Sequence, residues 1–233
     1  MQESYVTPAI AAPLEERSGF LRRVAGWTFA GLSLTAIVSI FSALFIAPLV
    51  LRVHWLVSLG VIYGSFILAQ TAARGMVYGK AKGAGFALGT SAIGIALGFL
   101  LFIVVATTGT AQEGLSIIGT ALLLVILSSL AMLMYVTIEK REFSMLRAGL
   151  AMLTLPMLGL MALQLIFPMH GTLGLVISGI FVLVSVGSLA YTLNVVVHSM
   201  STDMAMQGGY ELTLGIVVLF WNILTFLMRL RRR

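Results

Sequence analysis

Residues 175–233 read LVISGIFVLVSVGSLAYTLNVVVHSMSTDMAMQGGYELTLGIVVLFWNILTFLMRLRRR. The stretch contains two long apolar runs joined by a short polar connection, and it closes with Arg229 and Arg231 to Arg233. A helix needs about 20 apolar residues to cross a bilayer core about 30 Å thick, and both runs approach or exceed that length. The stretch therefore predicts two membrane-spanning helices.

Similar apolar runs recur along the chain. Sixty per cent of the residues are hydrophobic and 9% are charged, and the mean hydropathy is +1.08. Only helices and closed barrels satisfy their backbone polar groups in lipid, and runs that do not alternate in polarity exclude barrel strands. We therefore predict an all-α polytopic membrane protein. Its apolar segments are Val24–Leu51, Trp55–Ala73, Gly83–Thr107, Gly114–Ile138, Phe143–Phe167, Thr172–His198 and Glu211–Met228. They form one transmembrane domain, residues 23–233, after a polar cytoplasmic tail, residues 1–22.

Basic residues predict the orientation of the helices. They flank alternate connections: Arg17, Arg22 and Arg23; Arg74, Lys80 and Lys82; Lys140, Arg141 and Arg147. Because Lys and Arg concentrate on the cytoplasmic side, the N-terminus is expected there. Seven crossings would place the final arginine cluster on the opposite side, against the same rule. Either the basic residues of the early helices determine the orientation, or a late segment is re-entrant. Seven crossings are the favoured reading.

Several function classes are disfavoured by composition. The net charge of +6 is scattered over segment ends, which is not the basic patch of a nucleic-acid-binding protein. There is no cysteine, and no motif for a catalytic nucleophile, nucleotide, cofactor or metal stands in the sequence. All eight acidic residues lie outside the apolar segments or at their ends. We expect no enzyme activity, no cofactor, no bound metal and no small-molecule substrate.

The polar residues near the end of the sixth segment are the best candidate site. Asn194 and His198 are four residues apart and therefore share a helix face. Ionisable groups at this depth raise a functional hypothesis, and a histidine can titrate near neutral pH. The alternative is that His198 simply sits hydrogen-bonded or wet at the membrane interface. The candidate polar site comprises Thr192, Asn194, His198, Asp203 and Asn222, the last expected to bond across helices.

Small residues recur at a spacing of four. Glycines so spaced allow close contact between helix backbones in lipid, where packing holds helices together. A hinge or a pore could use the same residues, but close packing is the favoured interpretation. The pairs are Gly60 with Gly64, Gly85 with Gly89, and Gly94 with Gly98.

Two stretches carry a resemblance to a known family. They are Leu175 with Tyr191–His198, and Leu219–Leu224 continuing to Leu227–Leu230; the opening Phe20–Thr28 adds to them. Together with the segment count, they resemble the Bax inhibitor-1 (transmembrane Bax-inhibitor-motif) family. The likeness is closer to its bacterial inner-membrane branch, some members of which modulate the membrane AAA protease of protein quality control.

The resemblance implies six helices around a central seventh. It also implies, for some members, a pH-dependent calcium leak through one acidic residue on each of the last two helices. Those positions are Thr192 and Leu219 here, and neither can ionise. The expected function is therefore contact with another membrane protein or complex within the lipid bilayer, such as the quality-control protease. The alternatives are a cation leak that uses Asn194, His198 and Asp203, and an accessory scaffold subunit.

Overall fold

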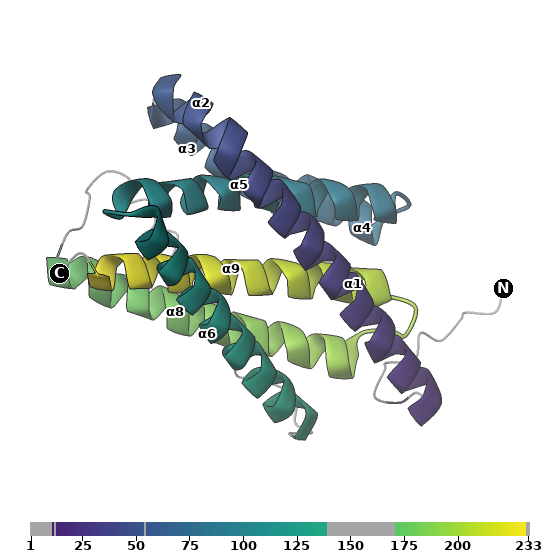
Figure 1. Ribbon diagram of the computed structural model, residues 1–233. Coiled ribbons are helices and arrows are strands. Elements are labelled where there is room, and N and C mark those ends of the chain that lie inside the picture. Colours follow the sequence, from purple (N-terminus) through teal and green to yellow (C-terminus); the bar gives the residue numbers. More distant parts are fainter. Residues whose placement is uncertain (1–10, 12, 54, 139–170, 232–233) are drawn as a thin grey trace.

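Every element of the described chain is a helix. The computed structural model describes residues 11, 13–53, 55–138 and 171–231 (Figure 1). Its long helices are α1 (Leu14–Phe41), α5 (Lys82–Thr107), α6 (Ala111–Ile138), α8 (Gly171–Asn194) and α9 (Ala205–Arg231). The shorter elements are η2 (Ser42–Ile46), α2 (Ala47–Val53), α3 (Trp55–Leu68), η3 (Ala69–Ala73), α4 (Arg74–Tyr78) and η4 (Val195–Ser199), of which the three η elements are π-helical.

Five helical stretches among these residues are long and apolar enough to cross a membrane. They are Leu14–Arg52, Lys82–Thr107, Ala111–Val136, Gly171–Ser199 and Ala205–Arg231. An all-α polytopic membrane protein is thereby confirmed. The second predicted segment, Trp55–Ala73, is also helical, as α3 and η3. The fifth, Phe143–Phe167, lies outside the described residues, so the count of seven crossings stays a prediction.

The first helix begins earlier than its apolar sequence does. Val24 opens the apolar run, but α1 starts at Leu14, so residues 14–22 of the predicted polar tail are helical. Glu15 and Glu16 lie in the first turn, where negative charge is favourable beside the helix dipole. Phe20 is fully buried and anchors this extension in the core. Hydropathy alone marks the apolar stretch and misses a helix that extends beyond it.

Helices α5 and α9 together form the centre of the bundle. Helix α9 contacts α1, α4, α5, α6 and α8, which matches the central last helix that the resemblance implies (Figure 1). Helix α5 is nevertheless the more enclosed of the two. In its most apolar 18-residue stretch 61% of the residues are buried, against 44% in α9, so the centre is shared between two helices.

Glycines on α5 explain this enclosure. A Cβ atom built at Gly85 would lie 2.7 Å from the carbonyl oxygen of Ala73, and one at Gly94 would lie 2.9 Å from that of Thr35. One at Gly98 would lie 2.6 Å from the carbonyl oxygen of Ser39, and one at Gly89 would overlap Tyr210. Three of these glycines thus face backbone atoms of η3 and α1, whereas Gly89 faces the side chain of Tyr210 on α9. No described atom lies within 4 Å of a Cβ built at Gly60 or Gly64.

Hydroxyl groups add cross-links between the packed helices. Thr35 Oγ1 donates to the carbonyl of Thr90 over 3.2 Å, and Ser42 Oγ donates to that of Ile95 over 2.9 Å. Tyr210 donates from α9 to the carbonyl of Ala69 in η3 over 2.6 Å. Each bond satisfies a hydroxyl inside an apolar bundle, where an unpaired polar group is costly.

The bundle has two chemically different ends. We call the end where α1, α5 and α9 begin the proximal end, and the end where α5 and α9 finish the distal end. Arg23 and Arg74 lie at the proximal end, whereas Arg229 and Arg231 lie at the distal end, beside Gly174 and Glu113. An odd number of crossings, such as the predicted seven, would place the first and last helix ends on opposite sides of the membrane, as these arginines are placed at opposite ends of the bundle. Both α8 and α9 run the length of the bundle, and each is long and apolar enough to cross a membrane (Figure 1).

Candidate functional site

Asn194 and His198 meet at the proximal end of α8. His198 lies in η4, the π-helical turn that finishes α8, and its ring is only 5% exposed. Its Nδ1 lies 3.3 Å from Asn194 Nδ2 and 3.2 Å from the backbone oxygen of Asn194. Nδ1 accepts from the amide in one tautomer and donates to the carbonyl in the other. His198 is therefore a buried, hydrogen-bonded histidine.

The other three residues of the candidate polar site do not join this pair. Thr192 Oγ1 donates to Ser188 O over 2.9 Å within α8. Asn222 Nδ2 donates to Val218 O over 3.0 Å within α9, so its observed bond stays in its own helix instead of crossing to another. Asp203 is exposed and accepts a bond from Ser201 Oγ. Within the described ranges, no three His, Asp or Glu side chains are placed to hold a metal ion.

The described interior of the bundle contains no buried carboxylate, lysine or arginine. Its buried polar side chains are hydroxyls and amides together with His198, and the ionisable groups among the described buried residues are the His198 ring and the Tyr210 hydroxyl. Leu219, one position of the carboxylate pair that the resemblance implies, is 0% exposed and packs in the apolar core. Thr192 at the other position carries only its hydroxyl. The described core thus provides no fixed negative charge that would attract a cation.

Polar contacts at the proximal end join α1 to the connection between α8 and α9. Arg23 Nη2 donates to the carbonyl of Thr202 over 3.1 Å, and Thr202 Oγ1 donates to Glu16 Oε1 over 2.7 Å. These bonds fix the first turns of α1 against the loop that follows His198. The helical extension before Val24 therefore takes part in the same surface as the candidate polar site.

A second proximal cluster links α4 to α9. Arg74 Nε lies 2.6 Å from Glu211 Oε1, and the hydroxyl of Tyr78 donates to the same oxygen over 3.1 Å. The Glu211 side chain is 15% exposed. Burial, followed by the nearby carboxylate of Glu211, raises the pKa of Tyr78 to about 12, so its hydroxyl stays protonated and continues to donate near neutral pH. The cluster holds a charged group of α9 at the edge of the membrane span.

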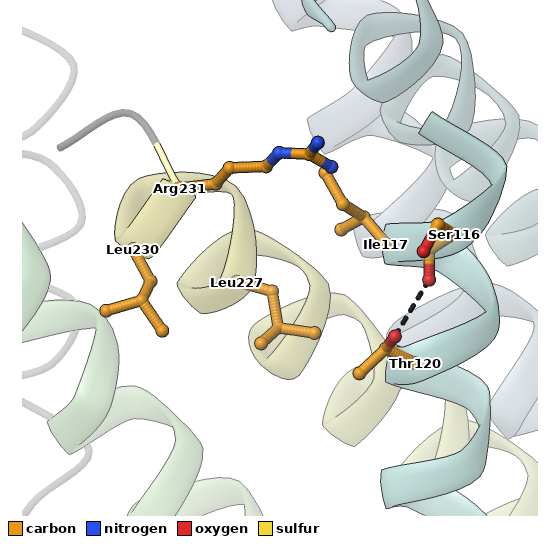
Figure 2. A pocket seen from close by; sticks show the side chains of 6 residues that line it. All are labelled: Ser116, Ile117, Thr120, Leu227, Leu230 and Arg231. Atoms are coloured by element: carbon orange, nitrogen blue, oxygen red, sulfur yellow. Dashed lines mark hydrogen bonds between the residues drawn. The ribbon is translucent and has the colours of Figure 1, made fainter. Parts of the chain in front are cut away.

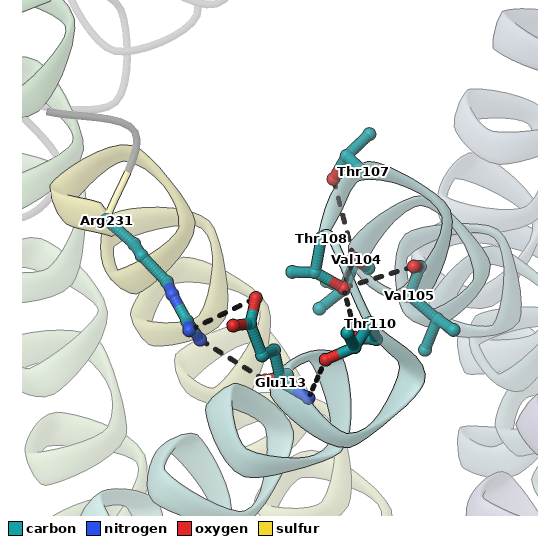
Figure 3. A network of polar contacts seen from close by, with 7 residues as sticks. All are labelled: Val104, Val105, Thr107, Thr108, Thr110, Glu113 and Arg231. Carbon is teal, nitrogen blue, oxygen red and sulfur yellow. Dashed lines mark hydrogen bonds and ion pairs between the residues drawn. The ribbon is translucent and has the colours of Figure 1, made fainter.

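The distal end carries an ion pair that sequence reasoning missed. Arg231 Nη2 lies 3.3 Å from Glu113 Oε2, and Arg231 Nη1 donates to Glu113 O over 3.4 Å (Figure 3). The amide of Glu113 donates to Thr110 Oγ1, which fixes the first turn of α6. Arg229 Nη1 donates to Gly174 O over 2.5 Å at the start of α8. The arginines that finish α9 therefore bind the first turns of α6 and α8.

Three cavities surround this ion pair, and Arg231 lines all of them. One of about 300 Å³ lies between α6 and α9 and is drawn in Figure 2, where Arg231 reaches across it from the end of α9. Its lining residues are Ser116, Ile117, Thr120, Leu227, Leu230 and Arg231. The other two, of about 170 and 380 Å³, also include Glu113 in their walls. A sequence signal existed, because Glu113 precedes the fourth apolar segment, Arg231 follows the last, and seven crossings would bring these two segment ends to the same side of the membrane.

A family model matches most of the chain. The family model described as "Inhibitor of apoptosis-promoting Bax1" matches residues 17–232, from the first turns of α1 to the end of the arginine cluster. No curated protein matches the chain. The family match covers both the proximal and the distal clusters.

Proposed function

Because this chain belongs to the Bax inhibitor-1 family, we propose that it is a multi-pass membrane protein that acts by contact with another membrane protein and does not conduct cations. The location that fits the resemblance is the bacterial inner membrane, with the N-terminus in the cytoplasm. The partner that fits it is the membrane AAA protease of quality control, whose activity this protein would modulate.

The observation that carries the proposal is the neutral interior of the described bundle. A pathway for a divalent cation needs oxygen ligands or fixed negative charge along it. Thr192 and Leu219 stand where the family's carboxylate pair would stand, and Leu219 is fully buried among apolar side chains. No described Asp or Glu is buried elsewhere in the bundle. The carboxylate-pair mechanism of cation conduction therefore lacks the two charged groups that it requires.

The proximal end is the surface that we assign to the partner. It gathers the described basic residues that predict a cytoplasmic side, Arg17, Arg22, Arg23, Arg74, Lys80 and Lys82, together with the connection that follows His198. Residues 1–13 precede α1 in the sequence, and we assign the engagement of an ATP-driven protease to this part of the tail. Partner contact at this end places the interaction on the side where ATP is present.

Two alternatives remain as second candidates. The observation that favours a cation leak is His198, a buried ionisable group beside Asn194 at the proximal end. A scaffold subunit would instead bind stoichiometric partners through the apolar faces of the bundle, without changing any activity. Both alternatives predict different partners, or no partners, in the experiment below.

Capture from native membranes tests the proposal. The full chain with a C-terminal affinity tag is cross-linked in the cell, purified in detergent and compared with a variant lacking residues 2–10. We expect the full chain to enrich the membrane AAA protease, because the tail is the proposed point of engagement, and we expect the deletion to lose that enrichment. The Lys82→Gln variant serves as a control for altered charge at the same end, since Lys82 is exposed.

Enrichment that does not exceed that of an unrelated polytopic protein would contradict partner contact. Stable recovery of a fixed set of other membrane proteins, unchanged by the deletion, would instead support the scaffold function.

A further inference from the structure

We propose that the groove at the distal end between α6 and α9 binds one ethanolamine phospholipid. Its phosphate would pair with Arg231 and its ammonium group with Glu113, while an acyl chain would lie over Leu227 and Leu230. This site is independent of the partner surface at the proximal end. Figures 2 and 3 show the groove and the ion pair at its mouth.

The depth of the groove matches that of a lipid headgroup. Thr107 finishes the span of α5, Glu113 lies in the first turn of α6, and Arg231 finishes α9. Three candidate spans thus end at this level, which is where the hydrocarbon core gives way to the headgroup region. A ligand that enters the groove from the bilayer arrives with its phosphate beside these two side chains.

The charges of the groove complement a zwitterion. Arg231 presents a guanidinium, which pairs well with phosphate oxygens, and Glu113 presents a carboxylate 3.3 Å away. The two side chains are 45% and 46% exposed, so both are open to a ligand. Exposed ion pairs contribute at most about 1 kcal/mol, so exchanging this pair for headgroup partners costs little.

The wall below the ion pair is apolar. Ile117 on α6 and Leu227 and Leu230 on α9 line the cavity beneath Arg231, with the Thr120 hydroxyl already satisfied by Ser116 O over 2.8 Å. The cavity of about 300 Å³ can take the upper part of an acyl chain, whose remainder would continue into the bilayer. A water-soluble headgroup without a chain would leave this wall unused.

Ethanolamine fits better than choline or glycerol. A primary ammonium donates hydrogen bonds to a carboxylate, whereas a quaternary ammonium has no donor and is usually held by aromatic faces. Among the described residues that line the three cavities there is no aromatic side chain. A glycerol headgroup carries no positive charge and would leave Glu113 facing the phosphate.

Native mass spectrometry of the full chain tests this assignment. The purified protein is titrated with phosphatidylethanolamine, phosphatidylcholine and phosphatidylglycerol that carry identical acyl chains. We expect one ethanolamine lipid to be retained, with an affinity about tenfold above the other two, which is the effect of one charge-assisted hydrogen bond. We expect Glu113→Gln to remove this preference while weak binding of all three lipids persists. Arg231→Gln should weaken every lipid about tenfold.

Controls separate the site from general effects on charge and folding. Lys82→Gln removes an exposed positive charge at the proximal end and should bind lipids as the unmodified chain does. The unfolding midpoint of each variant is measured, and Glu113→Gln, which keeps size and shape, decides the question if Arg231→Gln does not fold. Soluble glycerophosphoethanolamine should bind far more weakly than the lipid.

Equal retention of the three lipids would overturn the proposal. It would also be overturned if Glu113→Gln kept the preference for the ethanolamine lipid. A loss of lipid affinity in Lys82→Gln as large as that in Arg231→Gln would overturn it as well. Equally tight binding of the soluble headgroup would overturn the role of the apolar wall.

Discussion

Replacing Gly98 with valine is expected to destabilise the bundle by about 3 kcal/mol, the upper range for overpacking a tight core. A Cβ atom at this position would lie 2.6 Å from the carbonyl oxygen of Ser39 and would overlap the Cβ of Ser42. The Ser39 oxygen belongs to the backbone of α1, so it can move only if the helix moves. Ser42 also donates its hydroxyl to Ile95 O on α5, and that bond would be lost when the helices separate.

Gly119→Val is the matched control. Gly119 lies inside α6, and no described atom approaches within 4 Å of a Cβ built there. Both substitutions change helix propensity in the same way, so their difference isolates the contact between α1 and α5. The measurement is equilibrium unfolding in mixed micelles with increasing SDS, followed by tryptophan fluorescence. Equal losses in the two variants would show that α5 does not pack closely on α1.

Gly89→Ala is expected to cost about 2 kcal/mol, because the added methyl displaces a buried tyrosine. A Cβ at Gly89 would lie 2.6 Å from Tyr210 Cε2 and 2.7 Å from Cζ, and it would overlap the hydroxyl. That hydroxyl donates to Ala69 O, so displacing the ring also leaves a carbonyl of η3 without this donor. One methyl group therefore disturbs α5, α9 and η3 together.

A double-mutant cycle identifies the cause. Tyr210→Leu makes room at the same place, so Gly89→Ala with Tyr210→Leu should lose less stability than the sum of the two single changes. The same SDS titration measures all four proteins. Additive losses would show that the methyl at position 89 and the ring at position 210 do not compete for space.

Hydropathy predicted the helices well because crossing a bilayer constrains length and polarity directly. It misplaced the start of α1, since the turns before Val24 are stabilised by Phe20 in the core and by Glu16 at Thr202, and neither contact is visible in local sequence. The spacing of glycines singled out four α5 positions that face neighbouring helices, but it also singled out Gly60 and Gly64, where no described atom lies within 4 Å of an added Cβ. It missed Gly31 of α1, which faces Thr213 of α9, and Gly209 of α9, which faces Trp27 of α1, because neither belongs to a pair at a spacing of four.

The site was predicted only where its residues share a helix. Asn194 and His198 were expected on one face because they are four residues apart, and they are hydrogen-bonded. Asn222 was expected to bond across helices, but its amide donates to Val218 O one turn earlier in the same helix. A periodic sequence pattern cannot distinguish a bond within a helix from a bond between helices. The pairs Arg74 with Glu211 and Glu113 with Arg231 join distant parts of the chain. Their partners are set by how the helices pack, so sequence could place each charge but could not pair it.

The measurement that tests the central claim most directly is calcium flux in liposomes containing the purified full chain, recorded from pH 5 to pH 8. The described bundle contains no buried carboxylate, so the expected flux equals that of empty liposomes at every pH. A flux that changes with pH and is abolished by His198→Ala would contradict the account, because the protein would then conduct through the buried histidine.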